Sequence, residues 1–349
     1  MNKTFICLAA VAALLSVSCK KETAQPEIRE ESIIHIDIDD AGLGTRAGTP
    51  DVSSLGYETH IRKVEILVFN EKGQLNLYHD AGTELTGIQL SVNTGKKDIW
   101  VIVNGPEEVR SVIRAADLKA IRTLLEDNVT SGDGMGFIMA GNSECTVMPS
   151  ENNTCTVTVH RFATRVALTR LSVKLPPGYP QLKVRNVMLT DVVANQNLGG
   201  TAEPLMWYNP KGLAASGLPI DGSSGREAEC PDLTFRDSGT AVSNGSDLPL
   251  AAPWYFYGYP NPTVEDMTEA DGSFKAERTR LVVTAEIEGE IFYYTVPLPS
   301  FKRNTAYEVE LTIEGLGTGS PDILPQRGVV DASVSIQPWG PGAVIIENI

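Results

Sequence analysis

Short runs of β-branched and aromatic residues recur along this chain and restrict it to a β-rich fold. The runs are bounded by Gly, Asn and Pro, which is typical of strands separated by turns. Two of them are HIRKVEILVFN at residues 60–70 and AYEVELTIEG at residues 306–315. The pattern predicts strands within residues 33–39, 60–70, 98–105, 136–141, 153–160, 163–175, 181–193, 253–259, 278–289, 290–298, 306–315 and 328–339.

One helix is expected among these strands. Apolar residues return at spacings of three and four in residues 107–127, which predicts a helix with one buried face. Residues 209–250, rich in Gly, Ser, Asp and Pro, are expected to form a long surface loop. With 349 residues, 42% of them hydrophobic, the chain can fill one or two cores. We predict an all-β fold with one short helix and two β-sandwich domains that join near residues 160–165.

The N-terminus, MNKTFICLAAVAALLSVSCKKE, has the pattern of an export signal. Lys3 supplies positive charge, an apolar run follows, and small residues lead to Cys19. The apolar run is too short to span a bilayer. A cysteine directly after Ser18 predicts a bacterial lipoprotein acylated at Cys19, although Ser16 stands where leucine is usual. An ordinary secretory signal with an incidental cysteine is the alternative.

The segment after this leader combines a strand with a tether. Residues 33–39 alternate strictly, with Ile34, Ile36 and Ile38 on one face, which predicts a half-buried strand. The sequence GLGTRAGTP follows and surrounds Arg46 with small residues. Such a segment can enter a protease cleft, so the strand is held by a tether suited to cleavage.

The cysteines allow one disulfide. Of the five in the chain, Cys145 and Cys155 flank the turn-rich MPSENNT, so a hairpin would place them opposite one another. Export permits a disulfide there. Two reduced, half-buried cysteines are the alternative. The odd total and the lack of a CxxC pattern argue against a zinc or redox site.

Charge and motifs exclude several functions. A net charge of −15 without a basic stripe argues against nucleic acid as a partner. The chain lacks HExxH, GxSxG and P-loop motifs, so we expect no enzyme and no cofactor. No metal site is expected either, because none of the four histidines has a ligand neighbour at useful spacing; they are His35, His60, His79 and His160.

The order and spacing of several fragments resemble the fimbrillins, the type V pilins of Gram-negative gut and oral anaerobes. The fragments are KVEILVFN, WVIVNG, LKAIRTLLED, RFATRVALTRLSV, and FKRNTAYEVELTIEGLGTGSPD closed by VSIQPW. The resemblance covers essentially the whole chain. It implies two transthyretin-like β-sandwich domains, export as a lipoprotein, cleavage after an arginine by a surface protease, and assembly into fimbriae. GLGTRAGTP fits that cleavage position, so Arg46 and Ala47 would flank the cut.

The expected organisation follows from these patterns and the resemblance together. Residues 1–18 form a lipoprotein signal peptide, and residues 19–46 form a propeptide that contains the removable strand. Residues 47–162 form the N-terminal sandwich, and residues 163–349 form the C-terminal sandwich. The precursor is expected in the cell outer membrane as a lipoprotein, and the processed chain in a cell-surface fimbrium.

Removal of the strand at residues 33–39 would create an acceptor for another chain. Burial of its three isoleucines contributes on the order of 5–9 kcal/mol, against a typical domain stability of about 5–15 kcal/mol. Its loss leaves an apolar groove between unpaired strands, which is a template for a strand from a neighbour. Head-to-tail insertion does not close, so it yields a filament.

The chain ends in AVIIENI, the candidate donor strand. Its apolar residues are Val344, Ile345, Ile346 and Ile349. A terminal apolar strand is expected to dock somewhere, either in a neighbouring subunit or in its own C-terminal sandwich.

The leading hypothesis is a structural subunit of a fimbrium that polymerises by donor-strand exchange. Its partners would be other fimbrial subunits, an arginine-specific surface protease, and outer-membrane lipid through Cys19 before cleavage. A fimbrial anchor that keeps its acylated cysteine is one alternative. The other is a surface lipoprotein that binds a glycan on a host or bacterial surface, through the strand at Trp254 or the 209–250 loop. The alternation in PWYFYGYPNP favours a core strand over a sugar platform.

Overall fold

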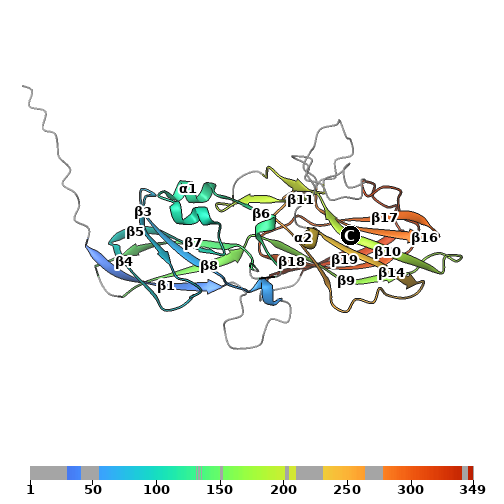
Figure 1. Ribbon diagram of the computed structural model, residues 1–349, viewed down its shortest axis with the longest axis horizontal. Helices are drawn as coiled ribbons and strands as arrows, with labels where there is room; N and C mark the ends of the chain where they lie inside the picture. Colours follow the sequence, from blue (N-terminus) through green and yellow to red (C-terminus); the bar gives the residue numbers. More distant parts are fainter. Residues whose placement is uncertain are drawn as a thin grey trace, which may run out of the picture.

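The computed structural model describes residues 30–40, 55–130, 132, 134, 136–149, 152–200, 204–209, 231–263, 278–339 and 345–348. The molecule is elongated, with the N-terminal strands at one end of its long axis and the C-terminal sheets at the other (Figure 1). Within these residues, no helix has the length and hydropathy needed to cross a membrane.

The N-terminal strands form one sheet that folds into two layers. The strand order is β3-β2-β5-β7-β8-β1-β4. β7 and β8 pair only at Met139–Arg161 and Ala140–His160 within the described residues, so the sheet turns a corner there. The inner faces of β3-β2-β5-β7 and β8-β1-β4 share one apolar cluster, which makes this half a sandwich. The strands are β1 (Glu31–Asp40), β2 (Val64–Asn70), β3 (Leu75–Asp80), β4 (Ile88–Asn93), β5 (Gly95–Val103), β7 (Met139–Val147) and β8 (Asn153–Arg161).

The predicted short helix is present, but its extent over residues 107–127 is wrong. The segment contains η2 (Glu107–Ser111), α1 (Ala115–Ala120), β6 (Arg122–Leu124) and η3 (Leu125–Asp127) instead. Long-range backbone hydrogen bonds interrupt the helix: Leu75 N–H donates to Ile113 O (2.9 Å), and Ala115 N–H donates to Gly73 O (2.8 Å). Most of its apolar residues still lie in or against the core, because the broken segment covers the outer face of β2 and β5, but Ile113 is 66% exposed.

The C-terminal half contains two larger sheets, ordered β14-β10-β16-β17 and β15-β9-β18-β19-β20. Both contribute to one apolar cluster, so they pack as a second sandwich. The two-stranded pairs β11–β13 and β12–β6 complete the fold. The elements are β9 (Thr164–Val173), β10 (Gln181–Thr190), β11 (Val192–Val193), β12 (Asn195–Asn197), β13 (Trp207–Tyr208), α2 (Pro231–Thr234), β14 (Phe235–Ser243), β15 (Trp254–Gly258), β16 (Arg280–Ile287), β17 (Glu290–Pro297), β18 (Thr305–Ile313), β19 (Val330–Pro338) and β20 (Ile345–Asn348).

The expected loop at residues 209–250 also needs correction, because it contains α2 and the strand β14. β14 lies at the edge of its sheet and pairs with β10 through a register shift. Of its residues only Val242 is buried. Because β14 is held mainly by backbone pairing and buries few side chains, its sequence shows no alternation of apolar and polar residues.

The predicted all-β fold with two sandwiches is confirmed. We propose the domain boundary between residues 162 and 163, where the chain passes from β8 to β9 and changes sheets. The contact between the halves is extensive, because a single apolar cluster runs from the outer face of β2 and β5 into the C-terminal sandwich. β6 of the N-terminal half also pairs with β12 of the C-terminal half. The two sandwiches are therefore packed together rather than linked loosely.

Candidate functional site

The candidate site is the position of β1 in the N-terminal sandwich. β1 runs antiparallel to β4, from Glu31–Asn93 to Ile36–Ile88. On its other side it runs parallel to β8, from Ile34–Asn153 to Asp40–Val159. Figure 1 shows β1 with these two strands at the N-terminal end of the molecule. β1 is therefore the central strand of the layer β4-β1-β8.

Alternate side chains of β1 enter the core, as its sequence pattern predicts. Ile34 is 1% exposed and Ile36 is 0% exposed. Ile38 is half-buried, and Ile33, on the opposite face, is 38% exposed. At about 1.5–3 kcal/mol for a fully buried side chain, the three inward isoleucines contribute about 4–7 kcal/mol. Apolar burial therefore holds β1 strongly in the sandwich.

The two ends of β1 contact polar groups of neighbouring elements. At its start, Asn153 Nδ2 donates to Ser32 Oγ and to Ile33 O, both at 3.1 Å. At its end, the Asp39 carboxylate lies near enough to His160 for its negative charge to affect the pKa of the imidazole. Burial and the Arg303 guanidinium lower the pKa of His160, and Asp39 partly opposes them. Removing β1 would thus also remove the exposed Asp39 carboxylate from its place near His160, on the face of β1 opposite the inward isoleucines.

Both neighbours of β1 depend on it for backbone pairing. Among the described residues, β4 has β1 as its only ladder partner. Over residues 153–159, β8 is also paired only with β1. Loss of β1 would therefore leave two unpaired strands facing an apolar groove, lined by Ile88, Leu90, Val92, Cys155 and Val157.

Several residues singled out in the sequence lie outside the described residues. They are Cys19, Arg46, Ala47, Val344 and Ile349. The backbone of Ile345 and Ile346 is placed in β20, which pairs antiparallel with β19 from Ile336–Ile345 to Ser333–Asn348. β20 is the edge strand of its sheet. This pairing agrees with a tail that completes its own sandwich and with a donor strand stored at an edge, so both alternatives remain.

The predicted neighbours Cys145 and Cys155 are free thiols that lie within hydrogen-bonding reach of one another. The Cys145 thiol donates a hydrogen bond to the Cys155 sulfur, which raises the pKa of Cys145 and lowers that of Cys155 to about 7. Cys155 is 4% exposed, whereas Cys145 is half-buried.

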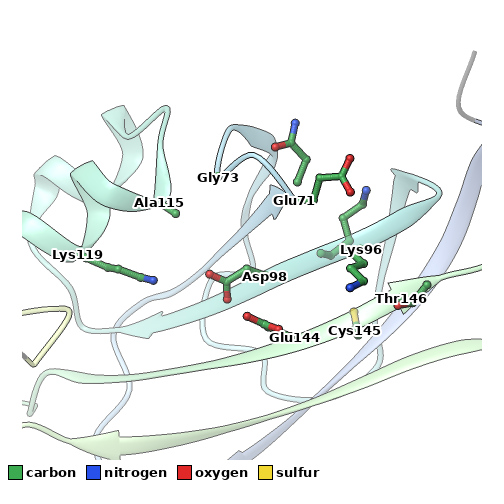
Figure 2. A pocket seen from close by; sticks show the side chains of 11 residues that line it. Glu71, Gly73, Lys96, Asp98, Ala115, Lys119, Glu144, Cys145 and Thr146 are labelled. Carbon is green, nitrogen blue, oxygen red and sulfur yellow. The ribbon is translucent and has the colours of Figure 1, made fainter. Parts of the chain in front are cut away.

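A hollow of about 670 Å³ lies beside these strands, between β5, β7, α1 and the β2–β3 turn (Figure 2). The side chains that line it carry both signs of charge. They include Lys96, Lys119, Asp98 and Glu144, together with Cys145. Mixed charges at an open surface favour polar solutes without selecting one sign.

The described residues place three rings of the strand considered for glycan binding in the core. No group of three or more His, Cys, Asp or Glu in that part of the chain could hold a metal ion. In the β15 strand and its extension, Phe256, Tyr257 and Tyr259 are 0% exposed. These three rings are part of the core, so they cannot form a stacking platform for a sugar.

Sequence reasoning missed a buried joint between the two halves. The Glu58 carboxylate, 0% exposed, accepts hydrogen bonds from Arg165 Nη1 (2.9 Å), Tyr257 OH (2.8 Å), Trp339 Nε1 (3.3 Å) and Leu55 N–H (2.9 Å). Arginine and carboxylate lie in the core, where their pairing offsets the cost of desolvating both charges. The only signal in the sequence is the pair of arginines in RFATR, which have no acidic residue close by in the sequence to neutralise them.

This joint ties the start of the N-terminal sandwich to the end of β19. Arg161 Nε donates to Glu58 O (3.1 Å), and Arg161 Nη1 donates to Trp339 O (3.2 Å). The Arg161 guanidinium also lies over the Trp339 ring at 4.8 Å. The base of the C-terminal tail is therefore fixed at the contact between the sandwiches.

Replacing Glu58 with Gln is expected to lower the free energy of unfolding by about 3 kcal/mol, because it leaves the buried Arg165 guanidinium without a carboxylate. Thermal or urea unfolding of the uncut chain measures the change. Glu107→Gln is the matched control, since Glu107 pairs with Arg110 at the exposed surface, and the melting temperature should stay unchanged there. Equal melting temperatures for both variants would contradict a structural role of the joint.

Comparisons with known proteins agree with this architecture. Residues 34–176, from β1 through β9, match the sequence model of the family "Major fimbrial subunit protein (FimA)". No curated protein matches the chain in sequence.

Three solved structures share the fold. A fimbrilin (FimA) of Porphyromonas gingivalis W83 has 14% sequence identity and a TM-score of 0.59, covering 88% of this chain and 98% of that one. A candidate cell adhesion protein of Parabacteroides distasonis ATCC 8503 has 16% identity and a TM-score of 0.58, covering 89% and 100%. The tip fimbrial protein Mfa3 of Porphyromonas gingivalis has 13% identity and a TM-score of 0.53, covering 89% and 100%.

The family match begins at Ile34, so it includes the strand whose removal would open the groove. The resemblance to fimbrillins predicted from the sequence is thereby confirmed. Residues 34–176 of this chain are therefore similar in sequence to the family of the major fimbrial subunit protein (FimA), and the chain shares the fold of solved fimbrial proteins.

Proposed function

We propose that this protein is a fimbrial subunit that polymerises by exchanging β1 for a strand of a neighbouring subunit. The observation that carries the proposal is the central place of β1 in the layer β4-β1-β8. A single segment, ending at Asp40, fills the space between two strands that have no other ladder partner there among the described residues. A strand from another chain can satisfy the same backbone groups and the same apolar positions.

The proposed maturation begins with export and acylation of Cys19, after removal of residues 1–18. The precursor is then held in the outer membrane by its lipid. Cleavage between Arg46 and Ala47 by an arginine-specific surface protease separates residues 19–46, including β1, from the mature chain. Residues 47–162 and 163–349 form the two domains that enter the fimbrium.

The test is the N-terminus of the protein in fimbriae sheared from cells. Ala47 as the first residue is expected for a processed subunit, whereas an acylated Cys19 would identify an anchor that is never cut. Arg46→Ala is expected to leave a folded precursor that does not polymerise. Arg46→Lys keeps the charge and should behave like Arg46→Ala if the protease is arginine-specific. Fimbriae of normal length from Arg46→Ala would overturn the proposed processing.

A further inference from the structure

The two neighbouring thiols connect opposite layers of the N-terminal sandwich. Cys145 of β7 pairs with Lys97 of β5, and Cys155 of β8 pairs with Ile36 of β1. Within the described residues, β7 and β8 share ladder pairs only at the ends farthest from the hairpin turn, at Met139–Arg161 and Ala140–His160. Near the hairpin, contact between the sulfur atoms therefore spans layers that the backbone does not join.

This position matters once β1 has left. Residues 153–159 of β8 then keep no ladder partner among the described residues, so the ladder no longer holds this wall of the groove near the hairpin, where the Asn153 side chain still bonds Met148 N–H and O. A wall that moves must be ordered again when a strand enters, and that ordering reduces affinity. A covalent link at Cys155 would remove this cost.

We propose that Cys145 and Cys155 form a disulfide that holds β8 against β7 and keeps the acceptor groove ready for an incoming strand. The role in strand acceptance rests on the proposed function, but formation of the bond does not. The bond closes a short loop across the hairpin and adds no side chain to the groove.

The chemistry is thiol–disulfide exchange with a small disulfide oxidant. Cys145 is half-buried and belongs to the lining of the polar hollow, so it is the accessible sulfur (Figure 2). Cys155, whose pKa is lowered to about 7, accepts the proton that Cys145 donates in the hydrogen bond, and the Cys145 sulfur attacks the oxidant RSSR, forms a mixed disulfide and releases one RS⁻. The released RS⁻ takes that proton from Cys155, and the Cys155 thiolate then attacks the Cys145 sulfur and releases the second RS⁻, which takes a proton from water. Two thiols are oxidised and RSSR is reduced to two RSH.

The experiment uses the full chain with Cys7→Ser, Cys19→Ser and Cys230→Ser, so that only the pair remains. Ile36→Asp is added to weaken the docking of β1, and Ile36→Ser replaces it if the aspartate variant does not fold. Oxidised glutathione is the oxidant, and mass spectrometry detects the loss of two hydrogens and the linked peptides. The probe for the groove is a labelled peptide with the sequence of residues 30–40, and its affinity is measured for the reduced and oxidised chain. Cys145→Ser in the same background is the control.

The expected result is a linked pair and an affinity for the peptide at least about tenfold higher in the oxidised chain, with no redox dependence in the Cys145→Ser control. Two results would overturn the proposal: thiols that stay free or glutathionylated, or equal peptide affinity in both redox states. A lack of peptide binding in both redox states would show that the chain has no acceptor groove, and it would overturn the proposed function as well. That failure is distinguishable, because the mass spectrum still shows whether the bond forms.

Discussion

Ile36→Asp is expected to lower the free energy of unfolding of the uncut chain by about 4 kcal/mol or more. The substitution removes a side chain that is 0% exposed and places a carboxylate between Ile88 of β4 and Cys155 of β8. A charge there must either be buried without a partner or expel β1 from the sandwich. Urea or thermal unfolding of the precursor measures the loss.

Ile33→Asp provides the matched control on the same strand. The same residue type receives the same charge, but Ile33 faces outward and is 38% exposed. Its effect should stay within about 0.5 kcal/mol. If both variants unfold like the parent chain, β1 is not docked in solution and the groove hypothesis fails. If both are equally destabilised, loss of strand propensity rather than burial explains the effect.

The same burial explains why a precursor would be both stable and ready to polymerise. While β1 is attached, its apolar side chains cover the core of the N-terminal sandwich. If the chain is cleaved as proposed, the strand would no longer be tethered, so its departure would gain translational entropy and depend on the protein concentration. A donor strand would recover the apolar contacts and both ladders. In the proposed assembly, the free energy that stabilises the precursor would thus be regained in the contact between subunits.

The strands with regular alternation were predictable from the sequence. β1 shows this most clearly, because one face of it meets the core and the other meets solvent, so every second residue is apolar. β16 and β18 were also predicted, since they are rich in β-branched residues and end at Gly or Pro. In such strands the local pattern and the tertiary environment agree, and a single sequence is enough.

The remaining elements depend on partners far away in the chain. The pattern at residues 107–127 does place apolar residues against the core, but backbone bonds from Gly73 and Leu75 decide their conformation. The Glu58 carboxylate meets partners 107 and 281 residues away in Arg165 and Trp339. No periodicity encodes a contact at that separation, so the joint between the sandwiches emerges only from the fold.

The tail can be tested by its register in the groove of a neighbouring subunit. A donor that replaces β1 must fill the positions of Ile34 and Ile36, which are almost completely buried, and of Ile38, which is half-buried. In AVIIENI, Val344, Ile346 and Asn348 share one face of a strand. In this frame two apolar residues take the buried positions, and the polar residue takes the partly exposed one. The opposite frame offers Ala343 and Ile345 followed by Glu347, which fills the buried space less well.

Ile346→Asp is therefore expected to abolish fimbriae, whereas Ile345→Asp should leave assembly largely intact. Both chains should still fold and be cleaved, because β20 is a four-residue edge strand paired on one side only. Melting temperatures of the cut monomers check the first expectation, and electron microscopy of sheared fimbriae checks the second. The reverse result would assign the opposite frame. Normal fimbriae from both variants would show that the tail only completes its own sandwich, and the newly freed segment after Ala47 would be the next donor to test.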